Sequence, residues 1–254
     1  MARLVAAEFR KLLTTRLWLW LLLGSVALTA LFACLAIAFG NDPDNPTPPL
    51  STGAGQRTVF SVAHGAAGPL VAVLAAVGMA GEFRHQTAST SFLATPRRSR
   101  VVLAKLISYP LVGAGYAVVC CALTVAIALP WLAADGIDVA LTGNGIPGTL
   151  AGVVAAVALF GLLGVGLAAL LRDQVASVVG LLVYLFVVEP VVTAIPALSS
   201  WSMYLPAASA DALTRVSQVG RDFLDPWQGG VMFAIYGVTL AVVGTLLTAR
   251  RDVV

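Results

Sequence analysis

The chain alternates long apolar stretches with short polar ones. Six apolar stretches run for about 20 residues or more, enough to cross the hydrocarbon core of a membrane as helices. They cover residues 17–39, 59–80, 105–131, 148–170, 175–196 and 230–248. The pattern predicts an all-α membrane protein in which residues 1–254 form a single transmembrane domain with six transmembrane helices. The first stretch is longer than the apolar core of a signal peptide, so we expect a retained anchor.

Two segments outside these stretches are too apolar to be free loops. Residues 1–16 predict an amphipathic helix at the membrane interface, with a simple positively charged anchor as the alternative. Its apolar and polar faces are Val5, Phe9, Leu12 and Leu13 against Arg3, Arg10 and Thr14. Residues 197–229 carry the interfacial aromatics Trp201, Tyr204 and Trp227 and also predict short helices.

The distribution of basic residues predicts the orientation. With six spans, three bases fall on one side of the membrane, Arg57, Arg215 and Arg221, and twelve on the other. Because Lys and Arg in short loops favour the cytoplasm, both termini and the 81–104 loop should be cytoplasmic. The twelve are Arg3, Arg10, Lys11, Arg16, Arg84, Arg97, Arg98, Arg100, Lys105, Arg172, Arg250 and Arg251.

Composition agrees with a membrane protein and narrows its chemistry. Hydrophobic residues make up 59% of the chain and charged residues 11%, where a soluble domain has about a quarter. The net charge is +3 without a basic soluble module, so we expect no nucleic acid partner. Cys34, Cys120 and Cys121 lie in apolar stretches without metal-ligand spacing, so we expect packing roles and no metal.

The polar loop at residues 81–104 has a structure of its own. Helix can continue over Glu82–Phe92, Pro96 interrupts it, and Ser99 can cap the next helix. Apolar side chains at Phe83, Phe92 and Leu93 in a segment that should face water indicate a docking surface. The alternative is a solvated loop that only sets topology.

The order of residues in this loop resembles the first cytoplasmic loop of ABC-2-type transporter permeases, especially those of high-GC Gram-positive bacteria. Ala88 departs from the family pattern, and the basic run Arg97–Arg100 leaves the register open. The matching positions are Glu82, Arg84, Thr87, Phe92, Leu93, Pro96, Arg98 and Lys105.

The resemblance implies a permease subunit of an ATP-driven exporter in the bacterial plasma membrane. Two permease subunits, identical or homologous, would form the path, surrounded by membrane lipids. Separate ATPase subunits would bind ATP and magnesium, so this chain would hold no cofactor. By resemblance, residues 1–16 are the helix that precedes the first span, and short re-entrant helices precede the last. The ATPase-binding residues would be Glu82, Arg84, Thr87, Phe92, Leu93, Pro96, Arg97, Arg98 and Arg100.

Two polar residues within spans are further candidates. Glu189 is the only acid in a span, but it lies about 22 Å from the inner edge at 1.5 Å per residue, where water or a helix end could satisfy it. We expect a structural role, with gating or substrate contact as the alternative. For His64 we expect a hydrogen-bonded packing role, with a ligand role as the alternative.

Two other functions remain open, a membrane-embedded enzyme and a membrane scaffold subunit without a transport path. The sequence contains no phosphate-binding P-loop, since no Gly is followed by Lys, and no H-E-x-x-H zinc motif. No Ser-His-Asp set can be assembled either, so we expect no catalytic residues and no ATPase site in this chain.

Overall fold

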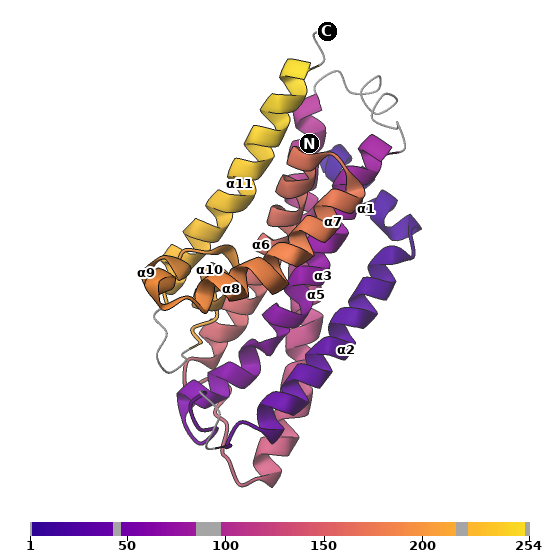
Figure 1. Cartoon of the computed structure of the whole chain (residues 1–254). Helices are drawn as coiled ribbons and strands as arrows, with labels where there is room; N and C mark the ends of the chain where they lie inside the picture. Colours follow the sequence, from indigo (N-terminus) through magenta and orange to yellow (C-terminus); the bar gives the residue numbers. More distant parts are fainter. Residues whose placement is uncertain (1, 43–46, 85–97, 217–222, 252–254) are drawn as a thin grey trace.

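The computed structural model describes residues 2–42, 47–84, 98–216 and 223–251, and in these residues every regular element is a helix (Figure 1). Six helices are long and apolar enough to cross a membrane, which confirms the predicted all-α class with six spans. The long helices are α1 (Ala2–Thr14), α2 (Leu17–Ala38), α3 (Gly53–Arg84), α5 (Arg98–Ala134), α6 (Ile146–Leu171), α7 (Gln174–Val183) and α11 (Pro226–Arg251). The short ones are the π-helix η1 (Tyr184–Val188), α8 (Glu189–Thr193), the 3-10 helix η2 (Pro196–Leu198), α9 (Ser199–Ser202) and α10 (Pro206–Leu213).

Helices α3 and α6 form the centre of the bundle. In their most apolar windows 72% and 61% of residues are buried, whereas the other four candidate spans bury between 22% and 33%. The reason is visible in the composition of α6, where small residues let neighbouring backbones approach. A side-chain carbon on Gly152 would clash with the carbonyl oxygen of Leu213, and one on Gly164 with that of Ala72. The small residues of α6 therefore form a packing seam within the chain.

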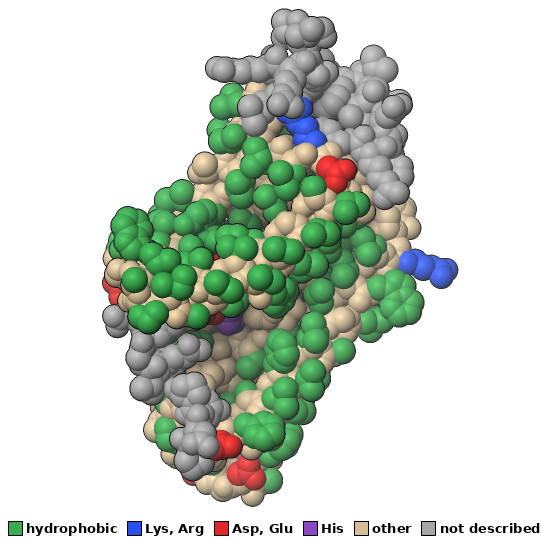
Figure 2. All heavy atoms as spheres, in the orientation of Figure 1, with side chains coloured by type: hydrophobic (Ala, Val, Ile, Leu, Met, Phe, Trp, Pro, Cys, Tyr) green, Lys and Arg blue, Asp and Glu red, His purple; other side chains and the backbone are tan. Residues whose placement is uncertain are grey.

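The outer helices expose their apolar faces. Large side chains such as Trp20, Leu31 and Phe186 lie on the surfaces of α2 and η1, and Ile235 lies on that of α11. Figure 2 shows apolar side chains spread over the visible face, with few charged groups, which lie toward its ends and at its left and right edges. Such a surface suits contact with lipid tails, as the six apolar spans require.

The two ends of the bundle differ in charge. Helix α1, the end of α3, the start of α5, the α6–α7 turn and the end of α11 lie toward one end (Figure 1). These are the segments that the sequence predicted to carry the twelve cytoplasmic bases. The connection between α5 and α6, with Asp135 and Asp138, lies at the opposite end. The helices thus gather the basic segments at one end.

Several helices extend beyond the predicted limits. Helix α3 begins at Gly53 and continues to Arg84, and α5 begins at Arg98, so both enter the stretch predicted as the 81–104 loop. Ser99 therefore lies within the first turn of α5 and not before it. The fourth and fifth spans are joined by a tight turn in which Arg172 has a positive φ of 58° and Asp173 caps α7, its side chain accepting from Ala176 N–H at 2.7 Å.

The fifth span is not one regular helix. Its α-helical part ends at Val183, and the π-helix η1 leads into α8. The N–H of Glu189 bonds to Tyr184 O, five residues earlier. Because a π-helical turn holds one extra residue, it turns the following residues relative to the helix before it. Glu189 is buried, while Phe186, Val187 and Val188 are exposed.

The short helices predicted between the fifth and sixth spans are present as η2, α9 and α10. They lie beside the bundle, part-way along its length (Figure 1). Asp211 of α10 bonds to His64, the twelfth residue of α3, about 16 Å from the start of that helix at 1.5 Å per residue. Helix α10 therefore contacts α3 about three turns from the start of that helix.

Candidate functional site

The predicted ATPase-binding residues fall mostly outside the described part of the chain. The backbone of Glu82 and Arg84 belongs to the last turn of α3. The backbone of Arg98 and Arg100 belongs to the first turn of α5. Thr87, Phe92, Leu93, Pro96 and Arg97 lie outside the described residues. Their role as a docking surface stays a prediction. The described residues do show how the two helices that flank this segment are held.

Lys105 is the central side chain at this end of the bundle. It is only 1% exposed, on the eighth residue of α5, whereas the sequence predicted it at the start of a span. Its Nζ donates to Glu8 Oε2 at 2.5 Å and to the carbonyl oxygen of Gly78 at 3.1 Å, and it lies 5.8 Å from the centre of the Tyr109 ring. Lys105 therefore joins α1, α3 and α5.

Glu8 completes a buried ion pair. It is the only buried side chain between residues 3 and 14, at 6% exposure, and its other oxygen accepts from Lys11 Nζ at 3.0 Å. Burial is the largest influence and would raise the pKa of Glu8, but the charge of Lys105 and the hydrogen bonds from Lys105 and Lys11 together outweigh it. The pKa of Glu8 is lowered, so the carboxylate is charged at neutral pH.

Helix α1 is attached to α5 more than to α2, which follows it in the chain. The two helices are separated at residues 15 and 16, where the Thr14 and Thr15 hydroxyls donate to the carbonyl oxygens of Lys11 and Leu12. The start of α2 is held independently, because the Tyr116 hydroxyl of α5 donates to the carbonyl oxygen of Trp18. Helix α5 thus holds α1 and α2 by two separate polar contacts.

A second polar pair lies toward the other end. His64 Nε2 lies 2.8 Å from Asp211 Oδ1, and its Nδ1 lies 2.6 Å from the carbonyl oxygen of Ser61. Both partners of the ring are acceptors, so satisfying both contacts requires a proton on each nitrogen opposite the Asp211 carboxylate. The pair joins α3 to α10. Both ring nitrogens are engaged, and both contacts are compatible with the hydrogen-bonded packing role that the sequence favoured, which stays a prediction.

Glu189 also binds α10. Its Oε1 accepts from the N–H of Ala208 at 3.0 Å, in the first turn of that helix, and the side chain is 3% exposed. Carboxylates are favourable at helix N-termini, where backbone N–H groups lack partners. The contact is the helix end that the sequence considered for Glu189, and it has a clear structural purpose. A gating role stays a prediction.

The outer connections form a further network around α10. Arg57 donates from Nη1 to Asn144 O at 2.9 Å and from Nε to Arg215 O at 3.4 Å. Gln56 accepts from the Asn144 amide at 3.0 Å and donates to Asp138 O at 3.2 Å. The start of α3 is thereby tied to the α5–α6 connection and to the residue just after α10.

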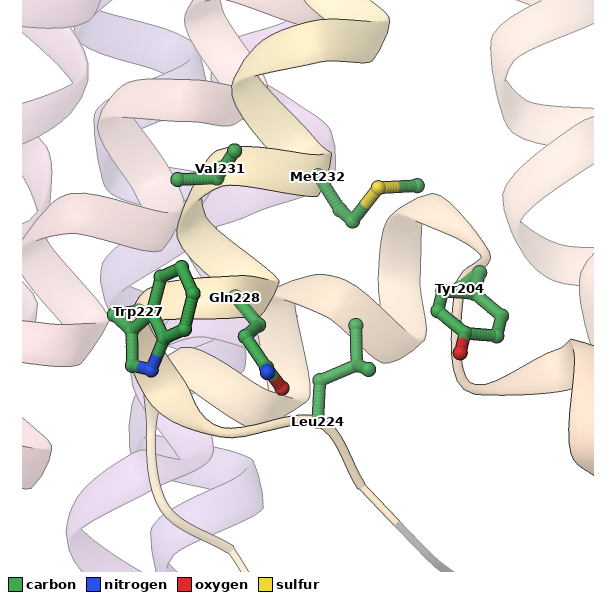
Figure 3. A pocket seen from close by; sticks show the side chains of 6 residues that line it. All are labelled: Tyr204, Leu224, Trp227, Gln228, Val231 and Met232. Atoms are coloured by element: carbon green, nitrogen blue, oxygen red, sulfur yellow. The ribbon is translucent and has the colours of Figure 1, made fainter.

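A shallow pocket of about 300 Å³ lies between α11 and the chain before α10. Tyr204 and Trp227 lie on its opposite sides, with Leu224 and Gln228 between them and Val231 and Met232 along α11 (Figure 3). The Tyr236 hydroxyl donates to Tyr204 O at 3.0 Å and fixes one wall. None of the six lining side chains is charged, so the pocket suits an apolar group better than an ion.

Two partners in these sites were missed by the sequence reading. Glu8 lies on the same side of its helix as the apolar Val5 and Leu12, and a single acid in an apolar stripe could have been noticed. Asp211 is 147 residues from His64, and no local pattern joins them. Among the described residues no cluster of His, Cys, Asp or Glu could hold a metal ion. Comparisons with models of known protein families and with curated proteins found no match to this chain.

Proposed function

We propose that this chain is the permease subunit of an ATP-driven ABC-2-type exporter. In this proposal two permease subunits form the path, and separate ATPase subunits act on the residues between α3 and α5. The observation that carries it is the buried Lys105–Glu8 pair. It links the two helices flanking the predicted docking segment to the N-terminal helix, at the end of the bundle where the basic segments gather. Force applied there reaches three helices at once.

The rival reading as a membrane-embedded enzyme has less support. It needs a base with a free nitrogen or carboxylate near a nucleophile. Both nitrogens of His64 are engaged, and the nearby Ser61 hydroxyl donates to the Thr58 carbonyl oxygen at 2.7 Å. A scaffold without a transport path is the remaining alternative, and it differs from the permease in its partners.

The decisive experiment is purification of the chain from its native host in mild detergent. We expect an ATP-hydrolysing subunit to co-purify, because the chain has no P-loop of its own. Replacing Phe92 and Leu93 by Ala should then release that subunit. Burying one such side chain contributes roughly 1.5–3 kcal/mol, so losing both should weaken docking by about a hundredfold or more.

The matched control is Arg97→Ala/Arg98→Ala, which removes two bases from the same segment and leaves the apolar residues in place. If docking depends on apolar burial, this variant should retain more of the ATPase than Phe92→Ala/Leu93→Ala at equal expression. Retention of the ATPase by the apolar variant would reduce the segment to a determinant of topology. A fully functional complex without any nucleotide-binding protein would refute the permease proposal itself.

A further inference from the structure

The contact between His64 and Asp211, which joins α3 to α10, needs one proton more than the free side chains carry. His64 Nε2 lies 2.8 Å from Asp211 Oδ1, and Nδ1 lies 2.6 Å from the carbonyl oxygen of Ser61. A neutral imidazole has one N–H, so its other nitrogen would turn a lone pair toward an oxygen that also only accepts. A proton on Asp211 that donates to Nε2 would satisfy the same contacts. In either case the pair holds one proton beyond a neutral ring and a carboxylate.

This proton can exchange with the medium, and few other groups nearby carry charge. The side chains of His64 and Asp211 are 12% and 27% exposed, so the pair is enclosed but not sealed. Helices α2, α6 and α7, which pack on α3, contain no Lys, Arg, Asp, Glu or His. The titratable groups in the core clusters beside α3 and α10 are phenols and thiols, which are ordinarily uncharged at pH 7: Tyr109, Tyr116, Cys120, Cys121, Tyr184 and Tyr236.

Three charged residues flank the pair, Arg57 and Arg215 on the two joined segments and Glu189 at the start of α10. The two arginines keep their charge over the whole range in which histidine titrates. Glu189 accepts from Ala208 N–H at the N-terminus of α10, where negative charge favours a helix. A rise in pH can only add negative charge to Glu189, which would hold α10 more tightly. Loosening of α10 at higher pH would therefore not come from Glu189.

We propose that His64 and Asp211 form a pH-sensitive latch, in which one shared proton holds α10 against α3 and loss of that proton loosens α10. Above the ordinary His pKa of about 6.5 the separated side chains hold fewer protons than the closed latch, so raising the pH favours the open state. The attachments of α10 at Glu189 and Gly152 remain when the proton leaves, so α10 loosens and is not released. The latch goes beyond the proposed function, since it would operate equally in a permease, an enzyme or a scaffold.

The test is hydrogen exchange of α10 in the full chain in lipid nanodiscs from pH 6 to pH 9, with rates corrected for the intrinsic effect of pH. Because hydrogen bonds to charged groups are among the stronger ones, protection of residues 207–213 should fall by about tenfold or more as the pH rises. His85→Gln leaves His64 as the only histidine, and the NMR signals of its ring nitrogens should change with the same midpoint. Constant protection of α10 over this range would overturn the latch.

Two variants remove the shared proton and keep a contact between α3 and α10. Asp211→Asn supplies an amide N–H that can donate to Nε2 of a neutral ring, and His64→Gln supplies one that can donate to the Asp211 carboxylate. In both we expect the protection of α10 to be independent of pH. The matched control is Glu189→Gln, which changes the other carboxylate that contacts α10 and should keep the fall in protection at higher pH.

The variants also identify the source of any pH dependence. A fall in protection as large in Asp211→Asn or His64→Gln as in the wild type would overturn the proposal, because the loosening would then come from another group. If one of these variants does not fold, the other carries the same test. If neither folds, different midpoints for the His64 ring signals and for the protection of α10 in the wild-type pair would overturn it.

Discussion

The bundle holds two of its peripheral helices, α1 at one end and α10 part-way along its length, by different chemistry. Helix α1 depends on a pair of buried, oppositely charged side chains, Glu8 and Lys105. Helix α10 is held largely through backbone atoms, by Glu189 at the N–H of Ala208 and by the close approach of Gly152 to Leu213 O. The side-chain contact of His64 with Asp211 is partly exposed, at 12% and 27%.

This difference predicts how the attachment of α1 and that of α10 should respond to substitutions. A buried ion pair fails when either partner is lost, because the other charge remains in an apolar setting. Several contacts with backbone atoms fail one at a time, and each contributes a smaller amount. We therefore expect α1 to be released by single substitutions that α10 withstands.

The largest effect should follow from Lys105→Met, which strands the Glu8 carboxylate. Loss of one partner from a buried pair costs about 3–5 kcal/mol. Thermal unfolding in detergent, together with hydrogen exchange of residues 2–14, should show this loss. The control is Lys11→Met, since Lys11 bonds the same carboxylate but is 53% exposed, and exposed pairs contribute about 0–1 kcal/mol. Equal losses of stability in Lys105→Met and Lys11→Met would contradict the view that the buried pair contributes more than the exposed one.

The next effect should come from the glycine seam under α10. Gly152→Ala places a carbon against the carbonyl oxygen of Leu213, and overpacking of this kind costs about 1–3 kcal/mol. Gly65→Ala is the matched control, because its new carbon meets no atom within 4 Å. It should be neutral or stabilising by up to about 1 kcal/mol, as Ala favours helix over Gly. The comparison is read from unfolding temperatures, and a neutral Gly152→Ala would speak against the seam.

A smaller effect is expected at the N-terminus of α10. Glu189→Leu removes the acceptor for Ala208 N–H and should cost about 1–3 kcal/mol, whereas Glu189→Gln keeps an acceptor oxygen and should cost less. Hydrogen exchange at Ala208 and its neighbours measures the difference directly. If Gln and Leu increase exchange equally, the charge matters and the hydrogen bond does not.

The smallest effect should be that of mild acid on α1. The folded-state pKa of Glu8 is lowered, so its stabilisation is complete above the ordinary value of 4.5 and is lost only as the pH falls through the lower folded value. The distance between a spin label at Arg10→Cys on α1 and one at Leu111→Cys on α5 should therefore stay unchanged from pH 7 to pH 5. Release of α1 within that interval would mean that Glu8 is not held as a carboxylate by Lys105.

The sequence predicted the six spans because apolar stretches of this length have few other uses. It also predicted the short helices before the last span, which depend on local composition. The sequence predicted that helix could continue past Glu82, and α3 does continue to Arg84. Helix α5 begins at Arg98, one residue before the Ser99 that the sequence considered as its cap.

The contacts within the sites were less accessible from the sequence. In the sequence, Lys105 looks like a basic residue at the border of a loop and an apolar stretch. Only the packing of the helices shows that it is buried among three of them. The partner of His64 lies on α10, whose position depends on the glycine seam of α6. For Glu189, position along the span indicated that water or a helix end could be its partner, but the π-helix that turns it inward leaves no signal in the composition.

That π-helix makes the chain sensitive to length as well as to residue type. If Tyr184–Val188 closed into an uninterrupted α-helix with all five residues kept, every later residue of the span would turn by about 100°, one step of a 3.6-residue repeat. Glu189 would leave Ala208 and move toward the lipid-exposed side, where a carboxylate is costly. Deleting one residue here would instead remove the extra residue and keep Glu189 near its present side of the helix, so a one-residue deletion should damage the protein less than a one-residue insertion.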